Sequence, residues 1–203
     1  MKRLTFTSNR QVTAALAEAH DVVKSGGVLL IPTESYYGLG ADVFCEASIA
    51  RICTMKHRAR ELGLPVLCAD WQQLVELVDV PDRFRVKLSR IWPAPLTAIL
   101  PARRETAAAR AGTLAVRIPG HDALRALIYR TGPLTGTSAN RHGRPACTET
   151  DEALGSLVEA PDLVLDAGPT PGGEPSTLVD LTGVEPRLLR PGKMLWEDPS
   201  PVP

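Results

Sequence analysis

The chain has 203 residues, of which 44% are hydrophobic and 23% charged, and its 23 basic and 23 acidic side chains cancel to a formal net charge of zero. This composition is typical of a globular domain, and it excludes a disordered chain and a polyanion binder of uniformly basic charge. No apolar run approaches the roughly 18 residues that cross a bilayer, and the first residues do not resemble a secretory signal. We therefore expect a cytoplasmic protein with no membrane partner.

The apolar pattern predicts alternating helices and strands. In chain order they are helix 11–25, strand 28–31, helix 46–56, strand 65–69, helices 71–78 and 82–91, strands 96–100 and 113–118, helix 122–129, strand 134–137, helix 149–158, and strands 163–166, 177–181 and 187–189. This order indicates an α/β fold, α+β in strict terms, with a mixed sheet because the last three strands have no helix between them. Residues 194–203 are expected to form a loose tail.

The four cysteines and four histidines show no metal-ligand spacing, so we expect neither disulfides nor a metal site built by the protein. The phosphate-binding signatures GxxxxGK[ST] and GxGxxG are absent from the sequence. A phosphate site in this protein would therefore be built largely from side chains.

The first candidate loop follows the first buried strand, in the position where open sheets bind ligands. Residues 32–40 read PTESYYGLG, which places Ser35 and Glu34 among hydroxyl and tyrosine side chains. We leave the role of Glu34 unassigned. As an alternative, Gly38 and Gly40 supply unusual backbone angles in a simple turn.

Lys56 and Arg58 come at the end of the second predicted helix. They can point into one cleft only if the helix stops there, and an ammonium beside a guanidinium fork suits a triphosphate. As an alternative, the two cations merely complement the negative end of the helix dipole.

The strand over 113–118 carries Thr113 and Arg117 on one face. An arginine at a strand end is suited to hold a carboxylate, and it is equally suited to a structural ion pair. Farther along, Ser138 and Asn140 lie in a turn whose polar groups either bind oxyanions or cap their own backbone. Ser176 and Arg190 flank the last two strands.

These segments resemble the YrdC family, whose members make threonylcarbamoyl-AMP for the t6A modification of tRNA. The resemblance runs from about residue 22 to 192. It rests on PTESYYGLG at 32–40, KHR at 56–58, WPAPLT at 92–97, LAVRIP at 114–119, TSAN at 137–140, PST at 175–177 and LRPG at 189–192. It implies one YrdC-like domain over 1–193, with a three-layer fold of a twisted mixed sheet flanked by helices around a basic concavity.

The resemblance also implies the roles of individual residues. Those facing ATP are Lys56, Arg58, Thr113, Ser138, Asn140 and Arg190, of which Lys56 and Arg58 are the catalytic candidates. Those facing L-threonine are Ser35, Arg117, Gly136 and Ser176. The implied reaction converts L-threonine, bicarbonate and ATP, with Mg2+ arriving on the ATP, into threonylcarbamoyl-AMP. A threonylcarbamoyl transferase complex then passes the group to tRNA.

Some positions depart from the family pattern. Members usually carry Pro after the Lys-x-Arg pair and Lys or Asn four residues beyond the Arg, where this chain has Ala59 and Leu62, and Arg60 is a candidate substitute. Leu67 stands where one subset of longer members has a threonine-contacting histidine, so the chain is nearer the short form without the extra C-terminal domain. Two alternatives stay open: an RNA-binding module, and a nucleotide-binding paralogue with another substrate.

Overall fold

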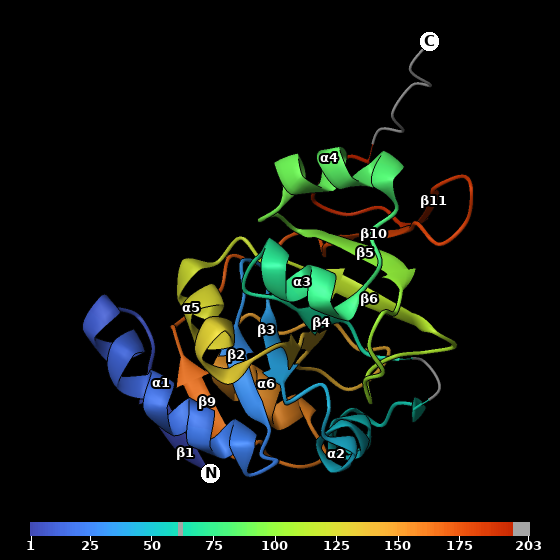
Figure 1. Ribbon diagram of the computed structural model, residues 1–203. Coiled ribbons are helices and arrows are strands. Elements are labelled where there is room, and N and C mark those ends of the chain that lie inside the picture. The colour runs from blue at the N-terminus through green and yellow to red at the C-terminus, as the bar shows by residue number, and fades with distance from the viewer. Residues whose placement is uncertain (61–62, 197–203) are drawn as a thin grey trace.

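The computed structural model describes residues 1–60 and 63–196 (Figure 1). The helices in this part of the chain are α1 (Asn9–Lys24), α2 (Glu46–Lys56), α3 (Trp71–Leu77), α4 (Asp82–Ile91), α5 (Asp122–Thr131) and α6 (Thr150–Ser156). Every predicted helix is confirmed, because each presents an apolar stripe to the core. At α1, Ser8 caps the first turn, and its side chain exchanges hydrogen bonds with Gln11.

The strands form two mixed sheets. The five-stranded sheet has the order β1 (Lys2–Thr5), β9 (Leu163–Asp166), β2 (Leu29–Pro32), β3 (Tyr37–Gly40) and β8 (Thr137–Ser138). The six-stranded sheet has the order β11 (Arg187–Arg190), β10 (Thr177–Asp180), β5 (Leu96–Pro101), β6 (Thr113–Arg117), β4 (Val66–Leu67) and β7 (Leu134–Thr135). The expected mixed sheet with flanking helices is confirmed, and it is divided in two. The strand predicted over 134–137 belongs to both sheets, and Gly136 joins its halves.

The five-stranded sheet is covered on both faces, as the continuous apolar run at 28–31 predicts. Leu29 and Ile31 of β2 belong to the core under α1 and α5, whereas Leu30 belongs to the larger core on the opposite face. All three are completely buried. Figure 1 shows α1 and α5 side by side in front of this sheet.

Around β5 and β6, the six-stranded sheet buries only one of its faces in the core, whereas both faces of β4 are buried. Leu114 and Val116 of β6 are core residues, as are the alternate residues of β5. The intervening residues of β6, Thr113, Ala115 and Arg117, line a hollow on the other face. The period of two along a strand thus gives β6 one packing face and one face available for a site.

Two strands were not predicted from the sequence. The edge strand β1 pairs only with β9, and its side chains are mostly exposed, so it has no apolar signal. β3 was predicted as part of a loop because it contains Gly38 and Gly40. Neither glycine has a positive φ, so the unusual-angle alternative is wrong. Instead, a Cβ at Gly38 would lie 3.2 Å from the carbonyl oxygen of Thr137, and the missing side chain lets β8 approach β3.

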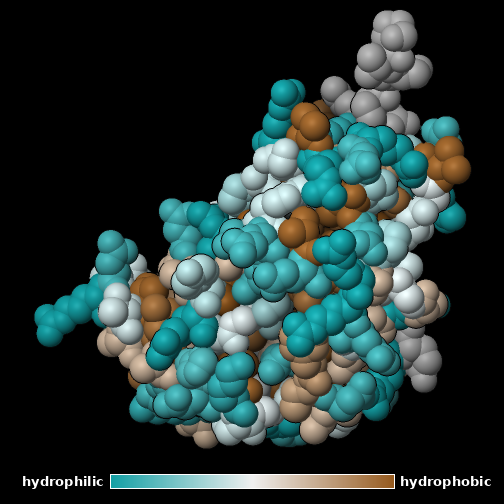
Figure 2. Space-filling view, in the orientation of Figure 1, coloured by the Kyte–Doolittle hydropathy of each residue, from teal (hydrophilic) through white to brown (hydrophobic). Residues whose placement is uncertain are grey.

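Hydrophilic side chains cover most of the face shown in Figure 2, between small apolar patches. Among the helices of the described residues, none is long and apolar enough to span a membrane. The boundary at residue 193 stays a prediction. Met194 bonds Thr177 and, with Trp196, packs against the core, whereas residues 197–203 lie outside the described part.

Candidate active site

A pocket of about 450 Å³ lies between the two sheets. Its walls come from the segment after β2, from β3 and β8 of the five-stranded sheet, and from β5, β6, β10 and β11 of the six-stranded sheet. Nine of the ten predicted site residues line it, and these are Ser35, Arg58, Thr113, Arg117, Gly136, Ser138, Asn140, Ser176 and Arg190. Residues that are distant in sequence are therefore brought together in one hollow.

The pocket is strongly cationic although the whole chain is neutral. Five arginines line it, and they are Arg58, Arg110, Arg117, Arg144 and Arg190. Among the described residues, no aspartate or glutamate is part of the lining. Burial lowers the pKa of Arg58, Arg117 and Arg190, because it removes water from their charges. Such a pocket favours an anionic ligand that replaces the lost water.

Lys56, the tenth predicted site residue, is not among the described residues that line the pocket. It is only 2% exposed, and its Nζ donates hydrogen bonds to the carbonyl oxygens of Ser138 and Asn140, the latter at 2.7 Å. Burial, together with the nearby Arg58 charge, lowers the pKa of Lys56 to about 8. Contrary to expectation, Lys56 and Arg58 therefore do not point together into the cleft.

The end of α2 explains why the two cations diverge. His57 adopts the left-handed conformation, with φ 50°, and the Arg58 amide donates back to the carbonyl oxygen of Cys53. The chain therefore turns sharply after Lys56. The Lys56 side chain lies beneath the turn at 138–140, whereas Arg58 lines the pocket and its Nη2 donates to the carbonyl oxygen of Gly63 at 2.9 Å.

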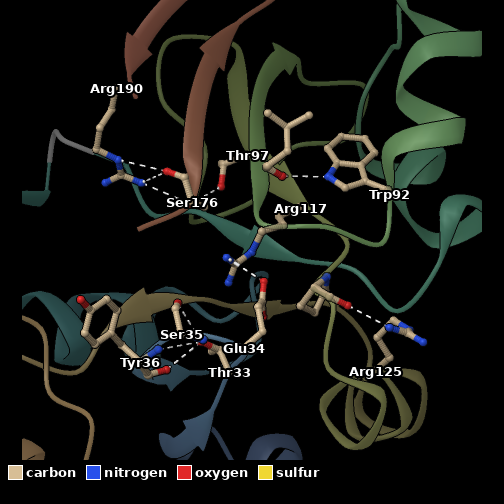
Figure 3. A network of polar contacts seen from close by, with 12 residues as sticks. Thr33, Glu34, Ser35, Tyr36, Trp92, Thr97, Arg117, Arg125, Ser176 and Arg190 are labelled. Carbon is tan, nitrogen blue, oxygen red and sulfur yellow. Dashed lines mark hydrogen bonds and ion pairs between the residues drawn. The ribbon is translucent and has the colours of Figure 1, made fainter. Parts of the chain in front are cut away.

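Arg117 forms an ion pair with Glu34, and the two atoms Nη1 and Oε1 are 3.2 Å apart (Figure 3). Both side chains are largely buried, with 7% and 13% exposed. The Glu34 charge raises the pKa of Arg117, opposing the larger effect of burial. The ion-pair alternative for Arg117 is thus realised, and because Arg117 also lines the pocket, its binding of a carboxylate stays a prediction.

Arg190 reaches the pocket from β11 and binds Ser176 (Figure 3). Its Nη2 donates to the carbonyl oxygen of Ser176 at 2.8 Å and to the hydroxyl at 3.2 Å, and that hydroxyl lies 2.9 Å from the hydroxyl of Thr97. Burial lowers the pKa of Arg190, and the charge of Arg117 adds to the effect. The two guanidinium groups therefore repel each other across the pocket, which an anion between them would relieve.

In the turn at 138–140 the Asn140 side chain bonds its own backbone, as the capping alternative predicts, and Thr33 does the same in the loop after β2. Thr33 Oγ1 donates to the carbonyl oxygen of Tyr36 at 2.7 Å, and Asn140 Nδ2 donates to the carbonyl oxygens of Arg141 and Arg144. Asn140 Oδ1 is buried and has no hydrogen-bond partner among the residues described. That oxygen can accept a hydrogen bond from a ligand in the pocket.

Close backbone approach shapes the pocket at two glycines. A Cβ at Gly136 would lie 2.4 Å from Cγ of Leu67, which packs into the space above the glycine. A Cβ at Gly192 would lie 2.2 Å from the carbonyl oxygen of Pro175 and 2.8 Å from the carbonyl carbon of Ser176. Glycine at these positions lets the chain fold tightly around the site.

Several lining residues were not predicted individually from the sequence, although two of them lie in the candidate loop at 32–40; they are Thr33, Tyr36, Thr97, Arg110 and Arg144. Residues 141–144 read RHGR, and this basic run could have signalled Arg144, whereas Arg110 has no such signal. Arg60 pairs with Glu46, is half exposed and is not among the lining residues in the described ranges, so it does not supply the missing family side chain in this pocket. Ala59 is exposed, and Leu62 lies outside the described residues.

Residues 21–192 match the Sua5/YciO/YrdC family model, which is described as "Telomere recombination". A putative threonylcarbamoyl-AMP synthase of Mycobacterium leprae is 35% identical over 186 residues, which are 90% of this chain and 84% of that protein. The structure of Pyrococcus abyssi Sua5 with L-threonine has a TM-score of 0.85 at 30% identity and covers 95% of this chain, which spans 58% of that one. The structure of Escherichia coli YciO has a TM-score of 0.80 at 25% identity, covering 95% of both chains.

Proposed function

The chain belongs to the Sua5/YciO/YrdC family, and we propose on that basis that it is a threonylcarbamoyl-AMP synthase. Such an enzyme joins L-threonine, bicarbonate and ATP into threonylcarbamoyl-AMP, releasing pyrophosphate and water. Relatives named as threonylcarbamoyl-AMP synthases, including the Bacillus subtilis protein at 34% identity, support this activity.

The observation that carries the proposal is the convergence of nine predicted residues around one cationic pocket. A triphosphate and an amino-acid carboxylate are both anions, and guanidinium forks bind both by paired hydrogen bonds. At about 450 Å³, the pocket has the size of a small-molecule site. These properties are what binding of ATP and an amino acid side by side requires.

We assign the two substrates to different ends of the pocket. Arg58, Thr113, Ser138, Asn140 and Arg190 would face ATP. Ser35, Arg117, Gly136 and Ser176 would face L-threonine, with Arg117 binding the carboxylate. The Pyrococcus abyssi Sua5 structure contains L-threonine, which supports threonine as one substrate of the family fold.

The chemistry needs little covalent work from the protein. The neutral threonine amine reacts with bicarbonate to give a carbamate and one water molecule. A carbamate oxygen then attacks the α-phosphorus of ATP, and the bond from that phosphorus to the bridging oxygen breaks, releasing pyrophosphate. Holding the reactants in line supplies about 7–11 kcal/mol, and arginines beside the departing pyrophosphate stabilise its growing charge.

Mg2+ would enter as part of the ATP substrate. The lining of the described residues offers hydroxyl and amide oxygens but no carboxylate, so the phosphate oxygens and water would supply most of the metal's ligands. The chain's own residues would then bind the phosphates around the metal.

The test incubates purified protein with MgATP, bicarbonate and L-threonine and measures pyrophosphate release together with the mass of the product. We expect product that depends on all three substrates, and less product with L-serine. Pyrophosphate release with another amino acid but not with L-threonine would identify a paralogue. RNA binding that weakens with salt, with no turnover, would identify an RNA-binding module.

The onward steps also belong to the proposal. The product is a mixed anhydride that a threonylcarbamoyl transferase complex would consume to modify tRNA, and any direct contact of this chain with tRNA would occur during that transfer. The cytoplasmic location stays a prediction.

A further inference from the structure

Lys56 lies behind the pocket wall, at the last position of α2. Its two hydrogen-bond acceptors are the backbone carbonyl oxygens of Ser138 and Asn140. Ser138 and Asn140 line the pocket, whereas Lys56 does not. The ammonium group is therefore separated from the pocket by the turn that it binds.

The same turn is held to its surroundings by backbone contacts as well. The His142 amide donates to the carbonyl oxygen of Lys56 at 2.7 Å, and the Arg141 amide donates to Ser156 Oγ at 3.0 Å. Lys56 thus contacts the segment 138–142 twice through its side chain and once through its backbone. In contrast, Ser138 is joined to β3 through its pairing with Gly38.

The ammonium group uses two of its three donors on these carbonyl oxygens and is 2% exposed, so it could reach a phosphate in the pocket only if its side chain or the turn moved. The Asn140 oxygen is buried and would lose its bond to Lys56 in such a move, which is costly, whereas the Ser138 oxygen also accepts from the Asn140 amide at 3.0 Å. Charge-assisted bonds to two carbonyls are, in addition, stronger than neutral ones. The arrangement with Lys56 beneath the turn is therefore more stable than one in which its ammonium group leaves the carbonyl oxygens for a phosphate.

We propose that Lys56 is a positioning residue that holds the turn 138–142 in the shape that binds the ATP phosphates, without contacting the phosphates itself. This inference rests on the proposed function for the identity of the ligand. The two residues of the Lys-x-Arg pair then have different roles: Arg58 faces the ligand, and Lys56 shapes the pocket wall formed by the turn 138–142.

The first test uses the wild-type protein and an amine-acylating reagent, with and without MgATP. Peptide mass spectrometry measures the modification of Lys56 against that of the exposed Lys24. We expect Lys56 to stay unmodified in both conditions at reagent levels that modify Lys24 fully. Modification of Lys56 without MgATP and protection with it would overturn the proposal.

The second test compares Lys56→Met with Lys24→Met, which removes an exposed lysine from α1. Hydrogen exchange is measured without any ligand on the peptide that contains residues 138–144. We expect exchange at least about tenfold faster in Lys56→Met and unchanged exchange in Lys24→Met, because only the first variant releases the turn. If Lys56→Met does not fold, Lys56→Gln takes its place. Its amide can bond one carbonyl oxygen, so its hydrogen-exchange rate should exceed that of the wild type by a smaller factor.

Ligand affinity completes the test through a difference between the two substrates. In Lys56→Met, we expect the affinity for MgATP to fall at least tenfold and that for L-threonine to change less than twofold. Weaker MgATP binding with unchanged exchange in the ligand-free variant would show direct phosphate contact and overturn the inference. Failure of the wild type to bind MgATP would instead refute the proposed function, while the exchange rates still report on the turn.

Discussion

The carboxylate of Glu34 and the guanidinium of Arg117 lie 3.2 Å apart at the base of the pocket, and both oxygens of the carboxylate are sealed from solvent. Glu34 itself is not among the lining residues within the described ranges, so Arg117 is the member of the pair that lines the pocket. The acid keeps the arginine charged and oriented in a buried place where an isolated cation would be costly. This relationship assigns Glu34 a supporting role that the sequence left open.

The first prediction concerns the affinity for threonine. Arg117→Lys keeps a cation beside Glu34 but loses the planar fork that binds a carboxylate by two hydrogen bonds. We expect the KM for L-threonine to rise about 10- to 100-fold, and the KM for ATP to change less than about threefold, because the lost bond is worth about 1.5–3 kcal/mol. Steady-state kinetics with each substrate varied in turn provide the measurement.

The control for this prediction is Arg103→Lys, which alters an exposed arginine paired with Asp79. It should leave both KM values unchanged. Equal increases of both KM values in Arg117→Lys would contradict the assignment of Arg117 to the amino acid.

The second prediction concerns the contact between Gly136 and Leu67. The added methyl of Gly136→Ala would overlap the Leu67 side chain, so we expect a loss of about 1–3 kcal/mol in the free energy of unfolding. Leu67→Ala removes the obstructing atoms and should recover much of that loss in the double variant. Urea unfolding of both single variants and the double variant measures the coupling, and additive losses would show that the two residues do not compete for space.

The third prediction concerns Tyr37. Its hydroxyl donates to the carbonyl oxygen of Gly168 at 2.6 Å and accepts from the Ala167 amide at 3.0 Å, and burial raises its pKa to about 12. Tyr37→Phe should lower the free energy of unfolding by about 1–3 kcal/mol, because it leaves these groups unpaired. The control Tyr129→Phe, at a residue 77% exposed, should change it by less than about 0.5 kcal/mol.

The raised pKa of Tyr37 also predicts a pH dependence. The folded protein holds the phenol proton above pH 10, where the unfolded chain releases it, so this group's contribution to stability declines as the pH rises from 10 toward 12. The stability difference between the wild type and Tyr37→Phe should narrow over this range. A constant difference would show that the hydroxyl titrates normally.

The fourth prediction concerns Lys56, whose pKa burial lowers from 10.5 to about 8. Between these values the unfolded chain binds more protons than the folded protein, so stability rises with pH. The free energy of unfolding of the wild type relative to Lys56→Met should increase by up to about 3 kcal/mol from pH 8 to pH 10.5. The difference between the wild type and Lys24→Met should stay flat, and a flat difference for Lys56→Met as well would mean that its ammonium is not destabilised by burial.

Periodicity predicted the helices and most of the strands, and it missed β1 and β3 for different reasons. Helix α1 and strand β2 were found because their apolar residues pack on the core. β1 lies at a sheet edge, where its mostly exposed side chains include the salt-bridged Lys2 and Arg3 and show no apolar pattern. β3 pairs on both edges, yet its two glycines are also typical of a loop.

The segments that form the site could be predicted from the sequence, but the directions of their side chains and the pairing of their strands could not. Residues at strand ends, such as Ser138 and Ser176, were found because strand ends bind ligands in sheets of this kind. The divergence of Arg58 from Lys56 depends on the left-handed conformation of His57, and a non-glycine residue does not signal that conformation in a sequence. The division of the strands into two sheets at Gly136 likewise depends on long-range pairing that local patterns do not contain.

The close approach of Gly192 to the backbone of Pro175 and Ser176 means that the segment after β11 packs main chain against main chain on the segment before β10. Glycine has no side chain that could contact a substrate, so the effect of a substitution at position 192 would depend on the space available for the new side chain. A mutational survey scored by activity would rank Gly192 beside Arg190 and Ser176 as indispensable. The loss of activity after substitution of Gly192 would result from the close fit between two stretches of main chain and not from a lost substrate contact.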